Sequence, residues 1–328
     1  MEKKTPENSN LQESRLGLGL AAIGRPEYIN IREHPDEDKA ESSYRQRAIS
    51  LLEFAYQKGV RDFDTAASYG KGEQFLKDWY HEKRYPDVRL SSKWGYTYKA
   101  NWKIGYKGPH EVKEHSLDKL QEQWSNAAEL LPGLKTYQIH SATFESGILK
   151  NKEVFDELDR IKRTTGIQIG VSVSGDNQKD VISTAAKIKV GGKDLFDSFQ
   201  VTYNILDIST HKVLSGLHEN GKTIIVKEAL ANGRLLRNKN YPRYEPLYRI
   251  LDEIASGYGV GTDAIALRFV MDHLKPSLVL SGAATKQQLD ANLKALNIQL
   301  SPEEIALLKK FHIEAEAYWL ERKQLSWN

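Results

Sequence analysis

The stretch DFDTAASYGKGEQFLKDWY, residues 62–80, joins a β-prone run to a helical pattern. Asp64 ends the β-prone run, and Tyr69 follows five positions later. A Gly-x-Gly-Glu break at residues 70–73 then opens the helical pattern. A strand followed closely by a helix is the repeating unit of parallel α/β folds. The stretch therefore predicts one strand–helix unit with two polar side chains in its turn.

The same order recurs along the rest of the chain. Amphipathic patterns such as residues 44–59, where Ile49, Leu52, Ala55 and Tyr56 share one face, predict helices. The β-prone runs between them are residues 16–22, 60–64, 88–93, 136–140, 167–173, 197–203, 223–229 and 277–282. Eight such units favour an α/β fold of the closed (β/α)8 type, a TIM barrel, over an open sheet.

We expect a single barrel domain over residues 15–328, because no Pro-rich or Gly-rich linker divides the chain. The polar residues 1–14 are expected to be mobile. A capping box formed by Ser301 and Glu304, with Pro302 at the first helical position, predicts a C-terminal helix. An aromatic tail follows that helix.

Composition excludes several classes of function. Lys and Arg number 47 against 44 Asp and Glu, and this small excess is scattered, so a nucleic-acid partner is not expected. The absence of cysteine excludes disulfides and thiolate chemistry, and the nine dispersed histidines do not predict a metal site. No apolar stretch is long enough to span a membrane, and no secretory signal opens the chain. We therefore expect a soluble, cytoplasmic protein.

Polar side chains stand at three of the predicted strand ends. In parallel barrels the catalytic groups lie at the C-terminal ends of the strands. Those positions hold Asp64, Lys93 and His140, and Tyr69 lies in the loop after Asp64. A turn aspartate, a packing tyrosine and a hydrogen-bonded core histidine are the structural alternatives. A lysine at such a position is partly buried and requires a countercharge, for which Asp64 is available.

The chemistry that these four side chains allow is narrow. A free tyrosine has a pKa of about 10, and a neighbouring ammonium group lowers it by favouring the phenolate. A carboxylate would hold that ammonium in place, and a histidine would orient a carbonyl oxygen. Together they would protonate the oxygen while a hydride reaches the carbon. Side chains do not donate hydride, so the hypothesis requires an organic cofactor.

The segments that carry these residues resemble a known family. In order along the chain, DFDTAASYGKGE, SSKWG, YQIHS, GVS, FQVTYN, ALANGRL and SGAATKQQLDANL resemble the aldo-keto reductase superfamily, over roughly residues 16–312. The resemblance implies a (β/α)8 barrel that binds NADP(H), less often NAD(H). It also implies Tyr69 as general acid/base, Lys93 with Asp64 as the pair that tunes the tyrosine pKa, and His140 as the carbonyl-orienting group.

The resemblance further implies residues that hold the nicotinamide half of the cofactor. Ser172 and Gln200 match the side chains that bind the carboxamide, whereas Val173 replaces the usual asparagine. Lys227 stands where an aromatic ring often stacks on the nicotinamide. A lysine cannot stack in the same way, and the alternative is contact with a phosphate or a substrate carboxylate. Leu230 lies in the loop that passes over the pyrophosphate.

The adenosine end is implied by the segment that begins at Ser281. The matching positions are Ser281, Gly282, Ala283, Gln288 and Asn292. Thr285-x-x-Gln288 is also a helix capping box, which is the structural alternative for Gln288. The arginine that commonly binds the 2′-phosphate is absent, and Lys286 is the nearest cation. We therefore expect NADP(H) to be accepted with a weak preference over NAD(H).

The loop at residues 94–107 is the candidate substrate loop, because it contains five aromatic residues and three lysines. We expect Trp94, Tyr98 and Trp102 to contact a substrate, with packing on the barrel rim as the alternative. Its lysines favour an anionic or polyhydroxylated compound. The tail residues expected to close the same pocket are Tyr318, Trp319 and Trp327.

The leading hypothesis is an NAD(P)(H)-dependent oxidoreductase that interconverts a carbonyl compound (an aldehyde, a ketone or a sugar) and an alcohol. Hydride would come from nicotinamide C4 and the proton would pass through Tyr69. The alternative is a regulatory subunit that binds NADP(H) and senses redox state for a partner protein.

Overall fold

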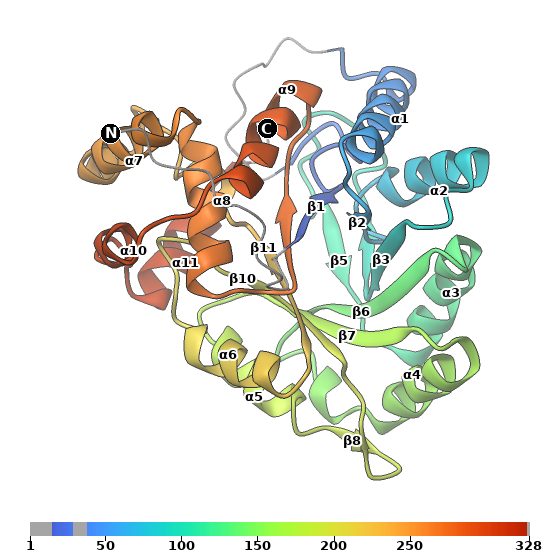
Figure 1. Ribbon diagram of the computed structural model, residues 1–328. Coiled ribbons are helices and arrows are strands. Elements are labelled where there is room, and N and C mark those ends of the chain that lie inside the picture. The colour runs from blue at the N-terminus through green and yellow to red at the C-terminus, as the bar shows by residue number, and fades with distance from the viewer. Residues whose placement is uncertain (1–14, 29–37, 327–328) are drawn as a thin grey trace.

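The computed structural model describes residues 15–28 and 38–326, and its core is a closed barrel of eight parallel strands (Figure 1). The predicted (β/α)8 class is confirmed, and each predicted β-prone run overlaps a barrel strand. The strands in order around the barrel are β1 (Arg15–Gly19), β2 (Asp62–Asp64), β3 (Arg89–Trp94), β6 (Leu134–Ala142), β7 (Gln168–Val173), β10 (Ser198–Thr202), β11 (Thr223–Lys227) and β12 (Leu278–Ser281). The expected mobile segment at residues 1–14 lies outside the described residues.

Helices surround the barrel on its outer side (Figure 1). Between consecutive strands lie α1 (Glu41–Gln57), α2 (Gly72–Lys83), α3 (Leu117–Ala127), α4 (Lys152–Thr165), α5 (Gln178–Ala185), α6 (His211–Glu219), α7 (Glu245–Tyr258) and α8 (Thr262–His273). Both α7 and α8 lie between β11 and β12, and α9 (Lys286–Leu293) follows β12. The strands are buried on both faces, which is why they read as short continuous runs in the sequence.

The C-terminal part begins as the sequence predicts. The capping box is present at the start of α10 (Pro302–Lys309), where Ser301 accepts from the Glu304 N–H. The expected aromatic tail is instead a second helix, α11 (Ala315–Lys323), with Tyr318 and Trp319 buried. Trp327 lies outside the described residues.

Two antiparallel hairpins interrupt the alternation of strands and helices. Part of the expected substrate loop forms β4 (Tyr96–Tyr98), which pairs with β5 (Glu111–Lys113). A shorter hairpin, β8 (Lys189–Val190) with β9 (Lys193–Asp194), follows α5. The longer hairpin lies near the candidate site, because it follows the strand that ends in Lys93 and Trp94.

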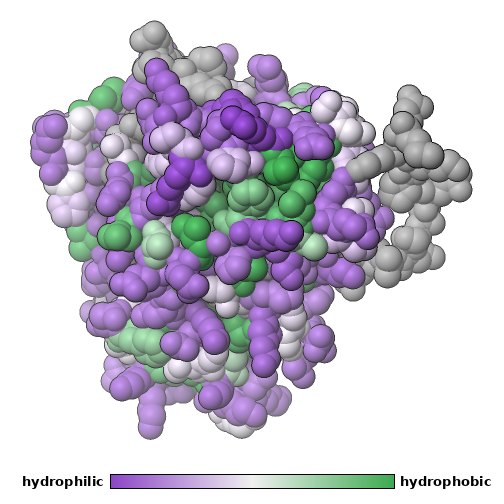
Figure 2. Space-filling view, turned by 90° about the vertical axis from the view of Figure 1, so that its left-hand side faces the viewer, coloured by the Kyte–Doolittle hydropathy of each residue, from purple (hydrophilic) through white to green (hydrophobic). Residues whose placement is uncertain are grey.

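The outer surface is largely hydrophilic. On the face that Figure 2 shows, hydrophilic residues cover most of the area and apolar residues gather in its upper part. Within the described ranges, every helix is too short or too polar to cross a membrane.

Close backbone contact fixes the turn that carries Tyr69. The Lys71 N–H donates to the Gly24 carbonyl at 2.7 Å, which ties the loop after β2 to the loop after β1. Gly70 has a φ of +61°, and a Cβ added there would overlap the Gly24 carbonyl oxygen. Only glycine satisfies both the backbone angle and this contact.

We predict that Gly70→Ala lowers the free energy of unfolding by about 3 kcal/mol, because backbone strain and overpacking add together. Gly147→Ala is the matched control, since Gly147 has a φ of +68° and nothing lies within 4 Å of the added Cβ. Backbone strain alone should lower the free energy of unfolding of Gly147→Ala by about 1 kcal/mol. Urea denaturation measures both variants, and equal losses would contradict the proposed contact.

Candidate active site

A buried ion pair lies at the C-terminal mouth of the barrel. The Lys93 ammonium donates to Asp64 Oδ2 at 2.5 Å and to the Thr65 carbonyl at 2.8 Å. Asp64 Oδ1 also accepts from Ser91 Oγ at 2.7 Å. Neither charged side chain has appreciable exposure, at 0% for Lys93 and 3% for Asp64. A fully buried lysine requires such a partner, and the pairing with Asp64 is the one that the sequence predicts.

Tyr69 and His140 stand next to this pair. The Lys93 ammonium lies 4.8 Å from the centroid of the Tyr69 ring. The Tyr69 and His140 rings meet edge to face, with their centroids 5.5 Å apart. The four predicted catalytic residues therefore come together from separate parts of the chain, as the barrel order requires.

The pKa of Tyr69 differs in direction from our expectation. Burial raises it well above its usual value, and the charge of Asp64 raises it further. Glu111 and Glu228 act in the same direction, whereas Arg25 acts to lower it. The Tyr69 phenol is therefore protonated near neutral pH.

His140 is neutral near pH 7. Burial lowers its pKa well below the usual value, and the Lys93 and Lys227 charges lower it further. Its Nδ1 lies 3.3 Å from the Ser68 hydroxyl. If that hydroxyl donates to Nδ1, then Nε2 carries the hydrogen and can donate to a carbonyl oxygen.

A second cation, Arg25, contacts the face of Tyr69 and was not expected from the sequence. Its guanidinium carbon lies 5.3 Å from the Tyr69 ring centroid and 4.8 Å from that of Tyr28. Glu111 of the β4–β5 hairpin forms an ion pair with Arg25 at 2.6 Å. Nothing in the local pattern around Arg25 indicates this role, because its position depends on the close approach of Gly24 to Gly70.

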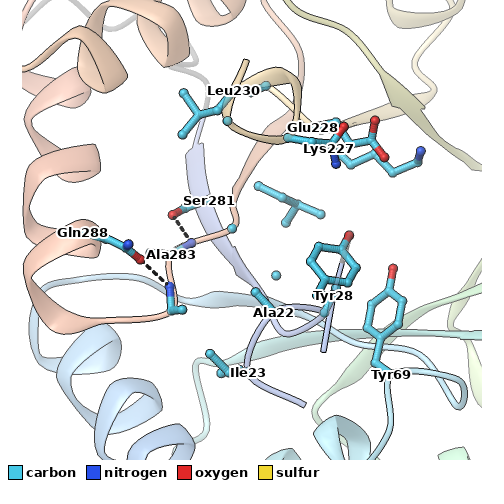
Figure 3. A pocket seen from close by; sticks show the side chains of 18 of the residues that line it. Ala22, Ile23, Tyr28, Tyr69, Lys227, Glu228, Leu230, Ser281, Ala283 and Gln288 are labelled. Atoms are coloured by element: carbon cyan, nitrogen blue, oxygen red, sulfur yellow. Dashed lines mark hydrogen bonds between the residues drawn. The ribbon is translucent and has the colours of Figure 1, made fainter. Parts of the chain in front are cut away.

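A cavity of about 1060 Å³ opens above these residues. Figure 3 shows its length, from Tyr69 and Tyr28 at one end to Gln288 at the other. The side chains of Tyr28 and Tyr69 extend toward Lys227 and Glu228 (Figure 3). Its volume is at the upper end of the range of small-molecule sites, which suits a long ligand.

The residues implied for the nicotinamide half lie at the catalytic end. Gln200 lines the cavity and donates from Nε2 to Asp64 Oδ1 at 2.9 Å. Its Oε1 is buried without a hydrogen-bond partner among the described residues, so it can accept from an amide group. Ser172 is fully buried, and its hydroxyl accepts from the Ser141 N–H at 2.9 Å. Leu230 also lines the cavity.

Lys227 lies at the end of β11 and also lines the cavity. Its ammonium donates to Ser174 Oγ and Thr202 Oγ1, both at 2.9 Å. Burial lowers the pKa of Lys227 to about 8. The neighbouring Glu228 forms an ion pair with Arg322 of α11 at 2.6 Å.

The residues implied for the adenosine end lie around β12 and α9. Ser281, Gly282, Ala283, Gln288 and Asn292 all line the cavity. The Asn292 amide donates to Ser281 Oγ at 2.8 Å, which fixes both side chains. Gln288 takes part in capping, because its Oε1 accepts from the Ala284 N–H and its own N–H donates to Thr285 Oγ1.

Lys286 is placed differently from the other residues of this set. Its ammonium lies 5.7 Å from the centroid of the Phe54 ring on α1. It is exposed and is not among the described residues that line the cavity. Arg47, Arg237 and Lys239, in contrast, are cations that do line the cavity.

The aromatic residues expected at the substrate pack elsewhere. Trp94 is fully buried against His115, and Trp102 packs on Tyr44 with its indole N–H donating to the Lys39 carbonyl. The Tyr98 hydroxyl accepts from the Trp102 N–H. The hairpin residues that line the cavity are instead Tyr96, Glu111 and Lys113.

The C-terminal helix contributes to the cavity through a different residue from those expected. The Tyr318 hydroxyl accepts from the Asn204 amide, and the Trp319 indole donates to Asp207, so both rings fasten α11 to the barrel. Arg322 is the α11 residue that lines the cavity.

The family model of the Aldo/keto reductase family matches residues 15–313. The chain belongs to this family of oxidoreductases, whose members use nicotinamide cofactors.

Proteins of known or assigned activity are among its relatives. The chain is 24% identical to the NADH-specific methylglyoxal reductase of Escherichia coli, over 94% of this chain and 98% of that protein. It is 25% identical to a probable aryl-alcohol dehydrogenase of Saccharomyces cerevisiae, over 82% and 88% of the two chains.

Solved structures show the same fold. An aldo-keto reductase from Bacillus halodurans in its holo form superposes with a TM-score of 0.66 at 21% identity, over 96% of this chain and 97% of that chain. A glycerol dehydrogenase from Gluconobacter oxydans gives a TM-score of 0.67 at 19% identity, over 94% of both chains.

We predict that Asp64→Asn lowers the free energy of unfolding by about 3–5 kcal/mol, because the buried Lys93 ammonium loses its countercharge. Adding Lys93→Met to this variant should recover much of the loss. The control is Asp290→Asn, which breaks the exposed pair with Lys58 and should cost no more than about 1 kcal/mol. Urea denaturation measures the free energy of unfolding of each variant. Equal decreases for Asp64→Asn and Asp290→Asn would show that the buried Lys93 ammonium does not depend on Asp64.

Proposed function

We propose that the protein reduces a small carbonyl compound to an alcohol, with Tyr69 as the proton donor. One observation carries the proposal. A buried, protonated phenol stands beside a neutral histidine at one end of a cavity of about 1060 Å³ that extends to Gln288 (Figure 3). The reverse oxidation uses the same groups in the opposite order.

In this proposal a carbonyl oxygen lies between Tyr69 and His140. His140 donates a hydrogen bond that orients the oxygen and increases the polarisation of the carbonyl bond. Tyr69 gives its proton to the oxygen as negative charge develops there. Lys93, held by Asp64, stabilises the negative charge that remains on the tyrosine oxygen.

The cavity fits a nicotinamide cofactor, which supplies hydride when bound. Gln200 has a free carboxamide oxygen for the nicotinamide amide, and Ser172 stands behind it on the neighbouring strand. Leu230 would contact the middle of the cofactor. At the other end we assign the adenosine half to Ser281, Gly282, Ala283, Gln288 and Asn292.

For the substrate we propose a small aldehyde, ketone or sugar. The relatives named for methylglyoxal, aryl-alcohol and glycerol chemistry support this range. Tyr96 and Tyr28 would flank such a compound, because both line the catalytic end of the cavity. Trp94, Tyr98 and Trp102 then act by packing the hairpin rather than by contact.

We predict that Tyr69→Phe lowers kcat by roughly 10²- to 10⁴-fold, the range for loss of a general acid, because the ring remains but its proton is lost. Cofactor affinity, measured by fluorescence titration, should stay within about twofold of the wild type. The matched control is Tyr137→Phe, because Tyr137 is buried and lies outside the cavity lining. Wild-type turnover in the Tyr69 variant would overturn the assignment.

For the cofactor we propose that both NADPH and NADH bind, with a preference of about tenfold or less for NADPH. Lys286 is the cation that we assign to the 2′-phosphate, which requires its side chain to leave the Phe54 ring. Lys286→Ala should lower NADPH affinity by up to about tenfold, on the order of 1.4 kcal/mol, and leave NADH unchanged. Isothermal titration of both cofactors measures this, and an unchanged strong preference for NADPH would exclude Lys286.

A further inference from the structure

Four polar residues form a connected group on the cavity wall next to His140. The Lys113 ammonium donates to the Ser141 carbonyl at 3.0 Å, and the hydroxyls of Ser141 and Ser174 lie 3.5 Å apart. The Lys227 ammonium donates to Ser174 Oγ at 2.9 Å. All four residues line the cavity, and we call them the lysine–serine group.

The carboxylates around the phenol are already paired with other cations. Three carboxylates raise the pKa of Tyr69, and each has its own partner. The pairs are Asp64–Lys93 at 2.5 Å, Glu111–Arg25 at 2.6 Å and Glu228–Arg322 at 2.6 Å. Within the described ranges, Lys113 and Lys227 form hydrogen bonds only to neutral oxygens. Even when Glu145, whose charge acts on Lys113, is counted, the five cations outnumber the four carboxylates.

Holding the ammonium groups of Lys113 and Lys227 in the cavity wall costs free energy when no anion is bound. Burying an ammonium group without a hydrogen-bonded anion is unfavourable, and burial lowers the pKa of Lys113 and Lys227 although the charges of Glu145 and Glu228 act to raise them. An ammonium group has three donors. Lys227 uses two of them on protein oxygens and Lys113 uses one, so donors remain for a ligand in the cavity.

The backbone conformation of Ser141 also supports a ligand-binding role for the lysine–serine group. Ser141 has a φ of +47°, in the left-handed region that a serine rarely adopts. Its N–H is held by Ser172 Oγ, and its carbonyl accepts from Lys113. This conformation of Ser141 is therefore maintained by contacts that also place the lysine–serine group beside His140.

We propose that the lysine–serine group is an anion subsite that binds a carboxylate on the carbonyl substrate. The proposal rests on the proposed function, because it requires a carbonyl at His140. The two oxygens of a carboxylate can each meet one ammonium group, with the serine hydroxyls as further donors. The preferred substrates are then aldehyde or keto acids, such as a uronic acid or a semialdehyde of a dicarboxylic acid.

The test compares matched acidic and neutral substrates. The pairs are glucuronate with glucose and succinic semialdehyde with butanal. In the wild type kcat/KM should be at least about tenfold higher for the acid of each pair. Lys113→Met and Lys227→Met should each lower the acid-to-neutral ratio about tenfold. Lys107→Met is the control, because Lys107 is exposed on the same hairpin and lies outside the cavity lining. A wild type without preference for acids would overturn the proposal.

The same lysines could instead bind the phosphates of the cofactor, and a second measurement separates the two sources of negative charge. Fluorescence titration with NADH and NADPH gives the affinity of each variant for the cofactor alone. If both affinities fall about tenfold in the two lysine variants while the acid-to-neutral ratio is unchanged, the group belongs to the cofactor site and the proposal is wrong.

Direct binding distinguishes failure of the subsite from failure of the proposed function. Glucuronate and succinate are titrated calorimetrically into the cofactor-saturated protein. Binding that is lost in the lysine variants supports the subsite even if no carbonyl compound is reduced. Absence of acid binding to the wild type overturns the subsite, while turnover of the neutral substrates would still support the proposed function.

Discussion

The buried pair of Asp64 and Lys93 is the interaction on which the active site depends. It joins the ends of two neighbouring strands, and Gln200 from the opposite side of the barrel binds the same carboxylate. The loop that carries Tyr69 starts at Asp64, and its Ala67 N–H donates to the Lys93 carbonyl at 3.1 Å. The Asp64–Lys93 pair therefore places charged groups next to Tyr69. It also fixes the path of the loop that carries Tyr69.

The loop after β1 also constrains the turn that carries Tyr69. Gly24 approaches the turn at Gly70 so closely that neither position accepts a Cβ without movement. This contact brings Arg25 over the Tyr69 ring, and Arg25 in turn holds Glu111 of the hairpin. The hairpin, the first loop and the catalytic turn are thus one connected unit around the phenol.

The sequence predicts the barrel and the grouping of the candidate catalytic residues for a common reason. Strands buried on both faces read as apolar runs, and parallel strand ends converge at one mouth, so the order of the strands is enough to bring Asp64, Lys93 and His140 together. The role of Arg25 was not predictable, because it depends on contact between two loops. The aromatic residues of the substrate loop could not be assigned from the sequence, because packing of Trp94 and Trp102 leaves the same sequence pattern as contact with a ligand.

The charges around Tyr69 bear on how its proton moves in the proposed reaction. Reduction needs a protonated phenol, and oxidation of an alcohol needs the phenolate as base. Burial and three carboxylates raise the pKa of Tyr69, and only Arg25 among the main contributors lowers it. At neutral pH the protein therefore holds the form that reduction consumes. A raised pKa also makes Tyr69 a weaker acid, so in the proposed reaction its proton moves only as negative charge develops on the carbonyl oxygen.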